Sequence, residues 1–393
     1  MNANQPSPSS AGVRAASSSA IEIIPVTPAL MDRFIRVPFR VHADDPQFVP
    51  PLMMERREAF SPKINPFFQH ATVQFWIARR DGVDVGRISA QLDHLAPSVK
   101  HEGAGHFGMI AADNDPAVFN ALFETAEAWL REHGCTKAIG PFNLSINEET
   151  GLLVDGFDTP PMLLMGHDRA FVGPQIERLG YTKTKDVLAY LMDIGQPYPD
   201  NVRKLVERPL KDEIRVRPMN MKRYHDDIVT MTSIFNDAWS GNWGFVPFTD
   251  AEIDHMAKSL KPILDPNLVA FAELNGEPVG FGVALPNINA AIGDFDGKLL
   301  PFNWAKLLWR LKVKGIRSGR VPLMGVKRSI SGLGARLVPF LIIDAMRKAA
   351  LAKGMREIEL SWILEDNLAM RGIIEALGGR AYKTYRLYEK SLA

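Results

Sequence analysis

An internal duplication constrains the fold of this chain more than any other feature of its sequence. Residues 75–90 (FWIARRDGVDVGRISA) predict a strand, an Asp-Gly turn and a second strand. Residues 270–284 (AFAELNGEPVGFGVA) repeat that pattern with an Asn-Gly turn, and Gly86 and Gly280 match at the offset that aligns the two turns. Because helical segments follow each hairpin, the fold class is predicted to be α/β, with two tandem units that each carry a mixed sheet.

The duplication divides the chain into three segments. Residues 1–20 are mostly Ser, Ala, Pro and Asn, without the apolar stretch of a signal peptide, so we expect a disordered tail. Residues 21–197 form the predicted N-terminal unit and residues 198–393 the C-terminal unit, with a proline-containing linker between them. A chain of 393 residues with 46% hydrophobic side chains is long enough to build two full cores.

Composition excludes several classes of protein. A net charge of +1 gives no general attraction to nucleic acid, so no nucleic-acid partner is expected. The single cysteine, Cys135, excludes an intrachain disulfide framework and favours a reducing, cytoplasmic compartment, where a buried structural thiol is expected. No apolar run reaches about 18 residues, so no membrane span is predicted. The nine histidines show no ligand spacing, so no metal site is predicted.

A basic, glycine-bearing turn distinguishes the second copy from the first. Residues 326–335 (VKRSISGLGA) lie between a predicted strand, 320–326, and a predicted helix, 337–353. Free backbone N–H groups at such a turn bind anions, so it is predicted to hold a pyrophosphate. The first copy has Asp113 and Asp115 at this position, which would repel a phosphate, so its loop is predicted to be degenerate.

An amphipathic, basic insertion occurs in the second copy. Residues 302–317 place Trp304, Leu307, Leu308 and Leu311 in a stripe at helical spacing, with Lys and Arg beside them. A basic amphipathic helix can lie in a membrane interface, which predicts a peripheral contact with the inner membrane. The alternative is an ordinary surface helix that packs its stripe on the sheet.

Together these patterns resemble the GNAT superfamily of acyl-CoA-dependent N-acyltransferases, as two units over nearly all of residues 21–393. More narrowly, the chain resembles the tandem-GNAT family that includes bacterial ceramide synthase. Four segments carry the narrower resemblance: residues 140–147 (GPFNLSIN), 151–158 (GLLVDGFD), 236–245 (NDAWSGNWGF) and 359–367 (ELSWILEDN).

The resemblance implies acyl-CoA as co-substrate, no prosthetic group, and a CoA site in the second unit. Backbone N–H groups near the end of the strand would face the thioester carbonyl, and those at the helix start would hold the pyrophosphate. Asn367 would lie beside the pantetheine arm or act as a helix N-cap, and both alternatives stay open. The expected CoA-binding residues are Gly325, Val326, Arg328, Ser331, Gly332, Gly334, Ala335 and Asn367.

A carboxylate on the following strand is the candidate general base. Alternation along a strand puts Glu357, Glu359 and Ser361 on one face, and Glu359 is the better placed to take the proton of an attacking ammonium. Glu148 and its neighbour Glu149 are alternative candidates for the general base, if the loop of the first unit closes over the second unit. The alternative for strand glutamates is that they face solvent.

The general acid departs from the superfamily pattern. Its usual tyrosine position, seven residues after the asparagine, is Ile374 here. Tyr385 and Tyr388 cluster with Tyr382 near the end of the sequence and are the predicted replacements. The alternative is that these tyrosines are packing residues with a solvated hydroxyl.

An aromatic cluster indicates the acceptor. Trp239, Asn242, Trp243 and Phe245 fit a long apolar amine better than a small polar one, although the same cluster could be a corner of the core. The resemblance implies transfer of a long-chain acyl group, from CoA or an acyl carrier protein, to a sphingoid-type base. Alternatives are small-molecule or protein N-acetylation with acetyl-CoA, a non-catalytic module that binds CoA or lipid, and an aminoacyl-tRNA-dependent transferase, which near-neutral charge disfavours.

Overall fold

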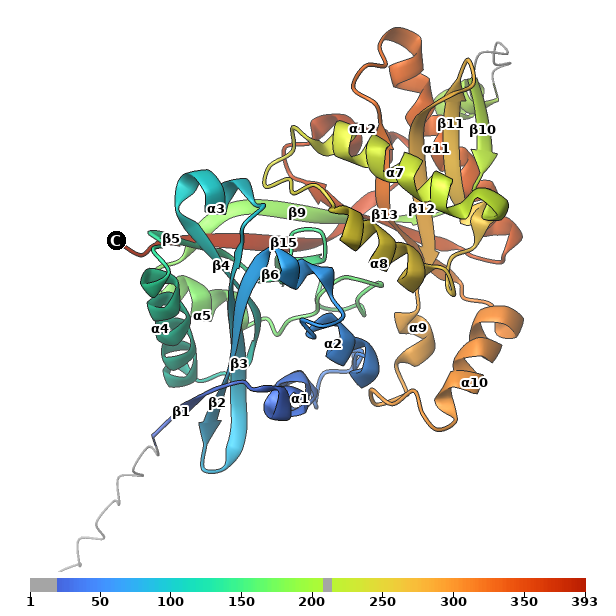
Figure 1. The fold of residues 1–393 in the computed structure, drawn as a ribbon. Helices are drawn as coiled ribbons and strands as arrows, with labels where there is room; N and C mark the ends of the chain where they lie inside the picture. Colours follow the sequence, from blue (N-terminus) through green and yellow to red (C-terminus); the bar gives the residue numbers. More distant parts are fainter. Residues whose placement is uncertain (1–19, 208–213) are drawn as a thin grey trace, which may run out of the picture.

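The computed structural model describes residues 20–207 and 214–393, except the side chains of residues 333–336. The predicted tail therefore lies outside the described residues, apart from Ala20. In the described residues, one mixed sheet of 13 strands runs through both halves in the order β1-β2-β3-β4-β5-β15-β9-β14-β13-β12-β11-β10, and β8 pairs with β15. The predicted α/β class with mixed sheets is confirmed (Figure 1).

The first half begins with strand β1 and ends with the long strand β9. Its strands are β1 Glu22–Pro25, β2 Ala71–Arg80, β3 Val83–Asp93, β4 Ala104–Ala112, β5 Lys137–Gly140, β6 Phe142–Asn143, β7 Glu149–Thr150, β8 Leu152–Asp155 and β9 Thr182–Asp193. Its α-helices are α1 Met31–Val41, α2 Met53–Ala59, α3 Pro97–Glu102, α4 Pro116–Glu132 and α5 Val172–Arg178.

The second half repeats this order with its own insertion. Its strands are β10 Ile214–Pro218, β11 Val269–Leu274, β12 Glu277–Pro286, β13 Ser318–Val326, β14 Glu357–Leu364 and β15 Arg380–Ser391. Its helices are α6 Asp200–Val206, α7 Tyr224–Trp239, α8 Asp250–Leu260, α9 Asn289–Ile292, α10 Asn303–Trp309, the π-helical turn η5 Arg310–Lys314, α11 Gly332–Ala352 and α12 Leu368–Ala376. No described helix is both long and apolar enough to cross a membrane.

The duplication is visible in equivalent local geometry. Gly82 and Gly276, the turn glycines of the β2–β3 and β11–β12 hairpins, have φ of 79° and 84°. At Gly86 an added Cβ would meet Leu122 of α4 at 2.8 Å, and at Gly280 it would meet Val338 of α11 at 2.9 Å. A side chain at either position would displace a residue of the helix, so glycine allows each long helix to cross its hairpin closely.

The last strand of each half is exchanged with the other half. β9 closes the first half in sequence, but it pairs with β14 of the second, and β15 pairs with β5 of the first. β9 and β15 also pair with each other, and they run side by side through the middle of the molecule (Figure 1). Neither half has a complete sheet without a strand of the other, so the two units are joined by backbone hydrogen bonds. The boundary between residues 197 and 198 stays a prediction.

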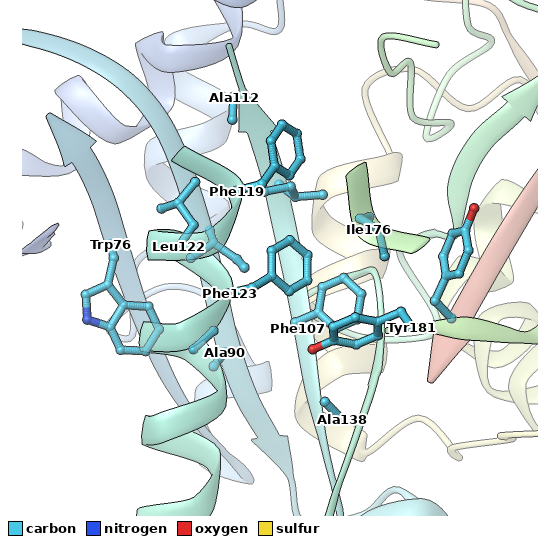
Figure 2. Close-up of a cluster of buried hydrophobic side chains, with 14 of the residues drawn as sticks. Trp76, Ala90, Phe107, Ala112, Phe119, Leu122, Phe123, Ala138, Ile176 and Tyr181 are labelled. Carbon is cyan, nitrogen blue, oxygen red and sulfur yellow. The ribbon is translucent and has the colours of Figure 1, made fainter. Parts of the chain in front are cut away.

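The first half has a large aromatic core between α4 and the sheet. Phe107 on β4, Phe123 on α4 and Tyr181 before β9 have pairwise ring-centroid distances of 5.2 Å, and the three rings lie together in Figure 2. Cys135 is buried at the edge of this cluster, and burial raises the pKa of its thiol. The expected structural role of the cysteine is confirmed, because a buried thiol of raised pKa is a poor nucleophile.

His106 makes stability depend on pH. It lies on β4, its Nε2 is 2.9 Å from Ser98 Oγ, and burial lowers the pKa of its imidazole to about 4. The unfolded chain therefore binds a proton that the folded chain excludes between about pH 6.5 and pH 4, so stability falls as pH falls through this window.

We expect His106→Gln to flatten this dependence. When the pH is lowered from about 7 to about 5, the free energy of unfolding should decrease by about 2 kcal/mol more in the wild type than in the variant. Urea unfolding at the two pH values measures the difference. Equal losses in the two proteins would contradict the buried, neutral state of this ring.

Candidate active site

Two parallel strands of the second half diverge to form a cleft. β13 and β14 pair in parallel from Ser318 and Glu357 as far as Val321 and Leu360, where their described pairing ends. Both strands continue beyond this point, so their facing edges have unpaired backbone groups. Such a gap can bind an extended ligand that carries amide groups.

Five of the predicted site residues line this cleft. It encloses about 240 Å³ between β13, β14, α12 and the end of α7. Ser361 and Trp362 of β14 and Pro339 of α11 also line it. The five predicted residues are Trp239, Asn242, Gly325, Val326 and Asn367.

The aromatic cluster is divided between the cleft and the core. Trp239 Nε1 donates to the Met324 carbonyl at 3.0 Å, which holds the ring against β13. The ring centroid of Trp243 lies 6.5 Å from that of Phe142, with the rings stacked. The ring centroid of Phe245 lies 5.8 Å from that of Phe235. Neither Trp243 nor Phe245 lines the cleft, and both pack beside the segment that follows Trp239 at the end of α7.

Asn367 is a helix N-cap, and its place beside a pantetheine arm stays a prediction. Its Oδ1 accepts a hydrogen bond from the Met370 N–H at 3.1 Å, so the helix N-cap alternative is confirmed for α12. The residue also lines the cleft. An amide used as a cap keeps its NH₂ group for a ligand.

The basic turn leads directly into the first turn of α11. The helix begins at Gly332, five residues before the predicted start, so Gly334 and Ala335 belong to its first turn. Ser331 is the N-cap residue, but its side chain makes no capping hydrogen bond. The first N–H groups of α11 are therefore left for another acceptor, which is the geometry that binds phosphate.

Arg328 fastens this turn to α7. Its backbone N–H donates to Asp237 Oδ2 at 2.7 Å, and its Nη1 donates to Ser240 Oγ at 3.0 Å. The guanidinium also lies 3.5 Å from the position of a Cβ on Gly241. The exposed Arg328 therefore links the turn before α11 to the C-terminal end of α7.

The equivalent helix of the first half is already capped. Asp115 Oδ1 accepts from the Ala117 N–H at 2.8 Å, its Oδ2 accepts from Arg80 Nη1 at 2.6 Å, and Pro116 occupies the first turn of α4. This carboxylate occupies the place an external anion would take, which supports the predicted loss of a phosphate site there.

Glu359 lies in a buried charged cluster next to the cleft residue Ser361. It is fully buried, its Oε1 lies 3.5 Å from Arg320 Nε, and Ser361 Oγ and the Tyr382 hydroxyl donate to its carboxylate. The solvent-facing alternative is therefore wrong for Glu359, whereas Glu357 is exposed. The β13–β14 register places Arg320 directly beside Glu359, which satisfies the buried charge.

Arg320 is a member of this cluster that the sequence did not predict. Its Nε donates to Ser361 Oγ at 2.7 Å, its Nη2 to the Ser361 carbonyl at 3.1 Å, and its Nη1 to the Leu163 carbonyl at 3.0 Å. Burial lowers the pKa of Arg320, and Glu359 opposes that effect. No sequence signal marks this residue, because its role depends on a parallel pairing between distant strands.

Among the three tyrosines, the structure brings Tyr382 and not the two predicted ones to Glu359. Tyr385 donates to the Gly166 carbonyl at 3.3 Å, and Tyr388 donates to Glu177 Oε1 at 3.1 Å. Register shifts in β15, at Ala381/Lys383 and at Leu387/Tyr388, prevent simple alternation from grouping the tyrosines. Burial, followed by the charge of Glu359, raises the pKa of Tyr382, so its hydroxyl stays a donor.

Glu148 lies in a separate charged cluster of the first half. Burial raises its pKa to about 8, with a further contribution from Glu149. Burial alone would raise the pKa of Glu149 too, but Arg56, at 2.8 Å, holds it below its usual value. The loop does pack on the second half, since Asn147 Nδ2 donates to the Val246 carbonyl at 3.0 Å. No described hydrogen bond joins Glu148 to Glu359.

His42, Asp45 and His167 form a compact polar cluster within 4.8 Å. Asp45 Oδ2 is 2.9 Å from His167 Nε2 and 3.4 Å from His42 Nδ1, so hydrogen bonds account for the grouping. The absence of a metal site stays a prediction.

These features define a tandem GNAT-type N-acyltransferase fold, with the cleft in the second unit. Two solved structures support the fold along the whole chain. The chain matches a tandem GNAT protein from the clavulanic acid biosynthesis pathway with a TM-score of 0.57, 13% identity and coverage of 95% of this chain and 99% of that one. It matches a GCN5-related N-acetyltransferase from Sphaerobacter thermophilus with a TM-score of 0.54, 15% identity and coverage of 95% and 96%.

Sequence comparison gives the narrower assignment. The chain is 54% identical over 376 residues to bacterial ceramide synthase of Caulobacter vibrioides, covering 95% of this chain and 98% of the relative. It is 44% identical to protein YghO of Escherichia coli over 362 residues, which is 91% of this chain and 92% of the relative. No family model matches. The chain belongs to the bacterial ceramide synthase family of N-acyltransferases, and the resemblance inferred from its motifs is confirmed.

Proposed function

We propose that the protein transfers a long-chain acyl group from acyl-CoA to the amine of a sphingoid-type base, giving a ceramide-type amide. The observation that carries this proposal is the Glu359 cluster at the base of the cleft, in a chain 54% identical to a bacterial ceramide synthase. The pantetheine arm lies in the cleft, beside Gly325, Val326 and Asn367. The pyrophosphate lies on the uncapped start of α11, from Ser331 to Ala335.

The amine attacks the thioester carbonyl carbon directly. A C–N bond forms, the C–S bond breaks, and backbone N–H groups near Gly325 stabilise the oxyanion. Ser361 lines the cleft and hydrogen-bonds to Glu359, so its hydroxyl passes the proton of the amine to the buried carboxylate. Arg320, whose Nε lies 3.5 Å from Glu359 Oε1, supplies the counter-charge beside that carboxylate.

The departing thiolate does not need a strong acid. A thiol has a pKa near about 8.5, so the thiolate leaves readily near neutral pH and is protonated afterwards by solvent or by the proton held on Glu359. This accounts for the replacement of the usual tyrosine by Ile374, which is fully buried. In this proposal Tyr385 and Tyr388 are packing residues, and Tyr382 orients Glu359.

Incubation of the purified protein with a long-chain acyl-CoA and a sphingoid base tests the activity. We expect the amide product in mass spectrometry and a stoichiometric release of free thiol. Acetyl-CoA should be a poor donor and polyamines poor acceptors. Efficient acetylation of polyamines without any long-chain amide would reject the lipid substrate.

The role of Glu359 can be tested by substitution, with Glu357 on the same strand as the control. We expect Glu359→Gln to lower kcat at least about a hundredfold, because a neutral amide cannot accept the proton. Acyl-CoA affinity, measured by isothermal titration, should change little, since Glu359 does not line the cleft.

Glu357→Gln is the matched control. Glu357 lies two residues earlier on β14 and is exposed, so the same substitution should leave kcat within about twofold of wild type. Equal effects of the two substitutions would show that Glu359 is not the base.

The insertion supports a contact with a membrane surface. Leu307 and Leu311 pack inward on a buried cluster, which fulfils part of the surface-helix alternative. The other large side chains point outward: Phe302 is 81% exposed, Val313 72% and Trp309 52%. Exposed Lys312 and Lys314 flank them. Exposed apolar groups beside lysines favour an anionic lipid surface, from which long-chain substrates would be collected.

We expect the triple variant Phe302→Ser, Trp309→Ser and Val313→Ser to sediment at least about tenfold less with anionic vesicles, because it removes the apolar side chains that enter the interface. A matched variant with serine at Ile64, Val83 and Val229, which are also exposed, should sediment like wild type. Unchanged sedimentation of the first variant would reject the membrane contact.

A further inference from the structure

A second cavity lies between the two halves, apart from the cleft. It encloses about 350 Å³, within the range of small-molecule pockets, and shares no lining residue with the cleft. Its walls come from α1, α2 and β4 of the first half and from the end of α8 and the start of α9 of the second. A ligand in it would contact both halves of the chain.

The wall nearest the reaction centre is one segment thick. Pro161 and residues 163–168 line the cavity. The Leu163 carbonyl accepts from Arg320 at 3.0 Å, and the Gly166 carbonyl accepts from Tyr385 at 3.3 Å. Arg320 contacts Glu359 on its other side, so the cavity lies directly behind the Glu359 cluster.

One end of the cavity is apolar and continues towards the insertion. Ile263, Ile288 and Ile292 line it from the second half, and Val49 and Leu52 from the first. Ile288, Ile292, Val49 and Leu52 belong to the hydrophobic cluster against which Leu307 and Leu311 pack. The α9 and α10 elements lie next to each other on this side of the molecule (Figure 1). The apolar end of the cavity is therefore continuous with the packed apolar cluster that supports α10.

The other end carries polar atoms that lack partners. Arg87 Nη1 donates to the Phe34 carbonyl at 3.1 Å, but its Nε has no hydrogen-bond partner within the described part of the chain. The same holds for His167 Nδ1. Glu149 and Asp168 also line this end and supply carboxylate oxygens. Buried polar atoms are nearly always hydrogen-bonded, so this end is suited to a ligand with both oxygen atoms and an amine.

We infer that this cavity binds the acceptor, a long-chain amine that carries hydroxyl or keto oxygens beside its amino group. The hydrocarbon chain lies along the apolar end, and the oxygens of the head group meet the unpartnered nitrogen atoms of Arg87 and His167. An acyl tail has no polar groups to offer these atoms, so the acceptor fits better than the tail of the acyl donor. The inference rests on the proposed acyl transfer for its substrate class.

Filling the cavity tests the inference. Ala111 lies on β4, lines the cavity and is buried, so Ala111→Phe should weaken binding of sphinganine at least about tenfold in isothermal titration. Acyl-CoA affinity should stay within twofold of wild type, within about 0.4 kcal/mol. Val83→Phe adds a ring at an exposed position of β3 and is the matched control. Ile263→Trp fills the cavity from the opposite half, in case Ala111→Phe does not fold.

A second measurement tests the polar end. Wild type should bind sphinganine more tightly than octadecylamine, which has the amine but no oxygens. Arg87→Leu should remove most of that preference while retaining octadecylamine binding, whereas a merely structural role would weaken both equally.

Three results would overturn the inference: unchanged sphinganine affinity in both filled variants, loss of acyl-CoA affinity instead, or no binding of sphinganine by the wild type. Sphinganine binding that is blocked by the filled variants, without any amide formed by the wild type, would uphold this site and reject the proposed acyl transfer.

Discussion

The burial of a carboxylate where two parallel strands separate is the constraint on which the rest of the site depends. Glu359 is fully buried, and removing such a charge from water is costly unless a counter-charge and hydrogen bonds compensate. Arg320 provides the charge, and Ser361 and Tyr382 provide the hydrogen bonds. These three partners come from β13, β14 and β15, so a correct β13–β14–β9–β15 arrangement is needed before the carboxylate can be accommodated.

The same arginine links the Glu359 cluster to the first half. Through Leu163 it holds the loop that separates the cleft from the inter-unit cavity. In the first half, Asp115 closes the start of α4. The insertion of that half supplies one wall of the cavity between the two halves. In our proposal, the unit whose helix start is closed by Asp115 contributes to the acceptor cavity.

Local sequence signals predicted the parts of this structure that depend on neighbouring residues. The Asp-Gly and Asn-Gly turns, the glycines beneath the long helices and the Asn367 cap follow from backbone geometry within a few residues. Arg320 and the choice of Tyr382 could not be predicted, because both depend on pairing between strands far apart in sequence. The exchange of β9 and β15 was equally hidden, since the two strands occupy equivalent positions and either could complete either half.

That exchange also has a consequence for how the protein is made on the ribosome. The edge of β5 faces β15, which is synthesised long after the first half is complete. While the second half is being translated, the first half therefore exposes the unpaired edge of β5. Its strand β9 also lacks its partner β14 until that strand has been synthesised. Chaperone protection during synthesis should matter more for this chain than for two GNAT units that each close their own sheet.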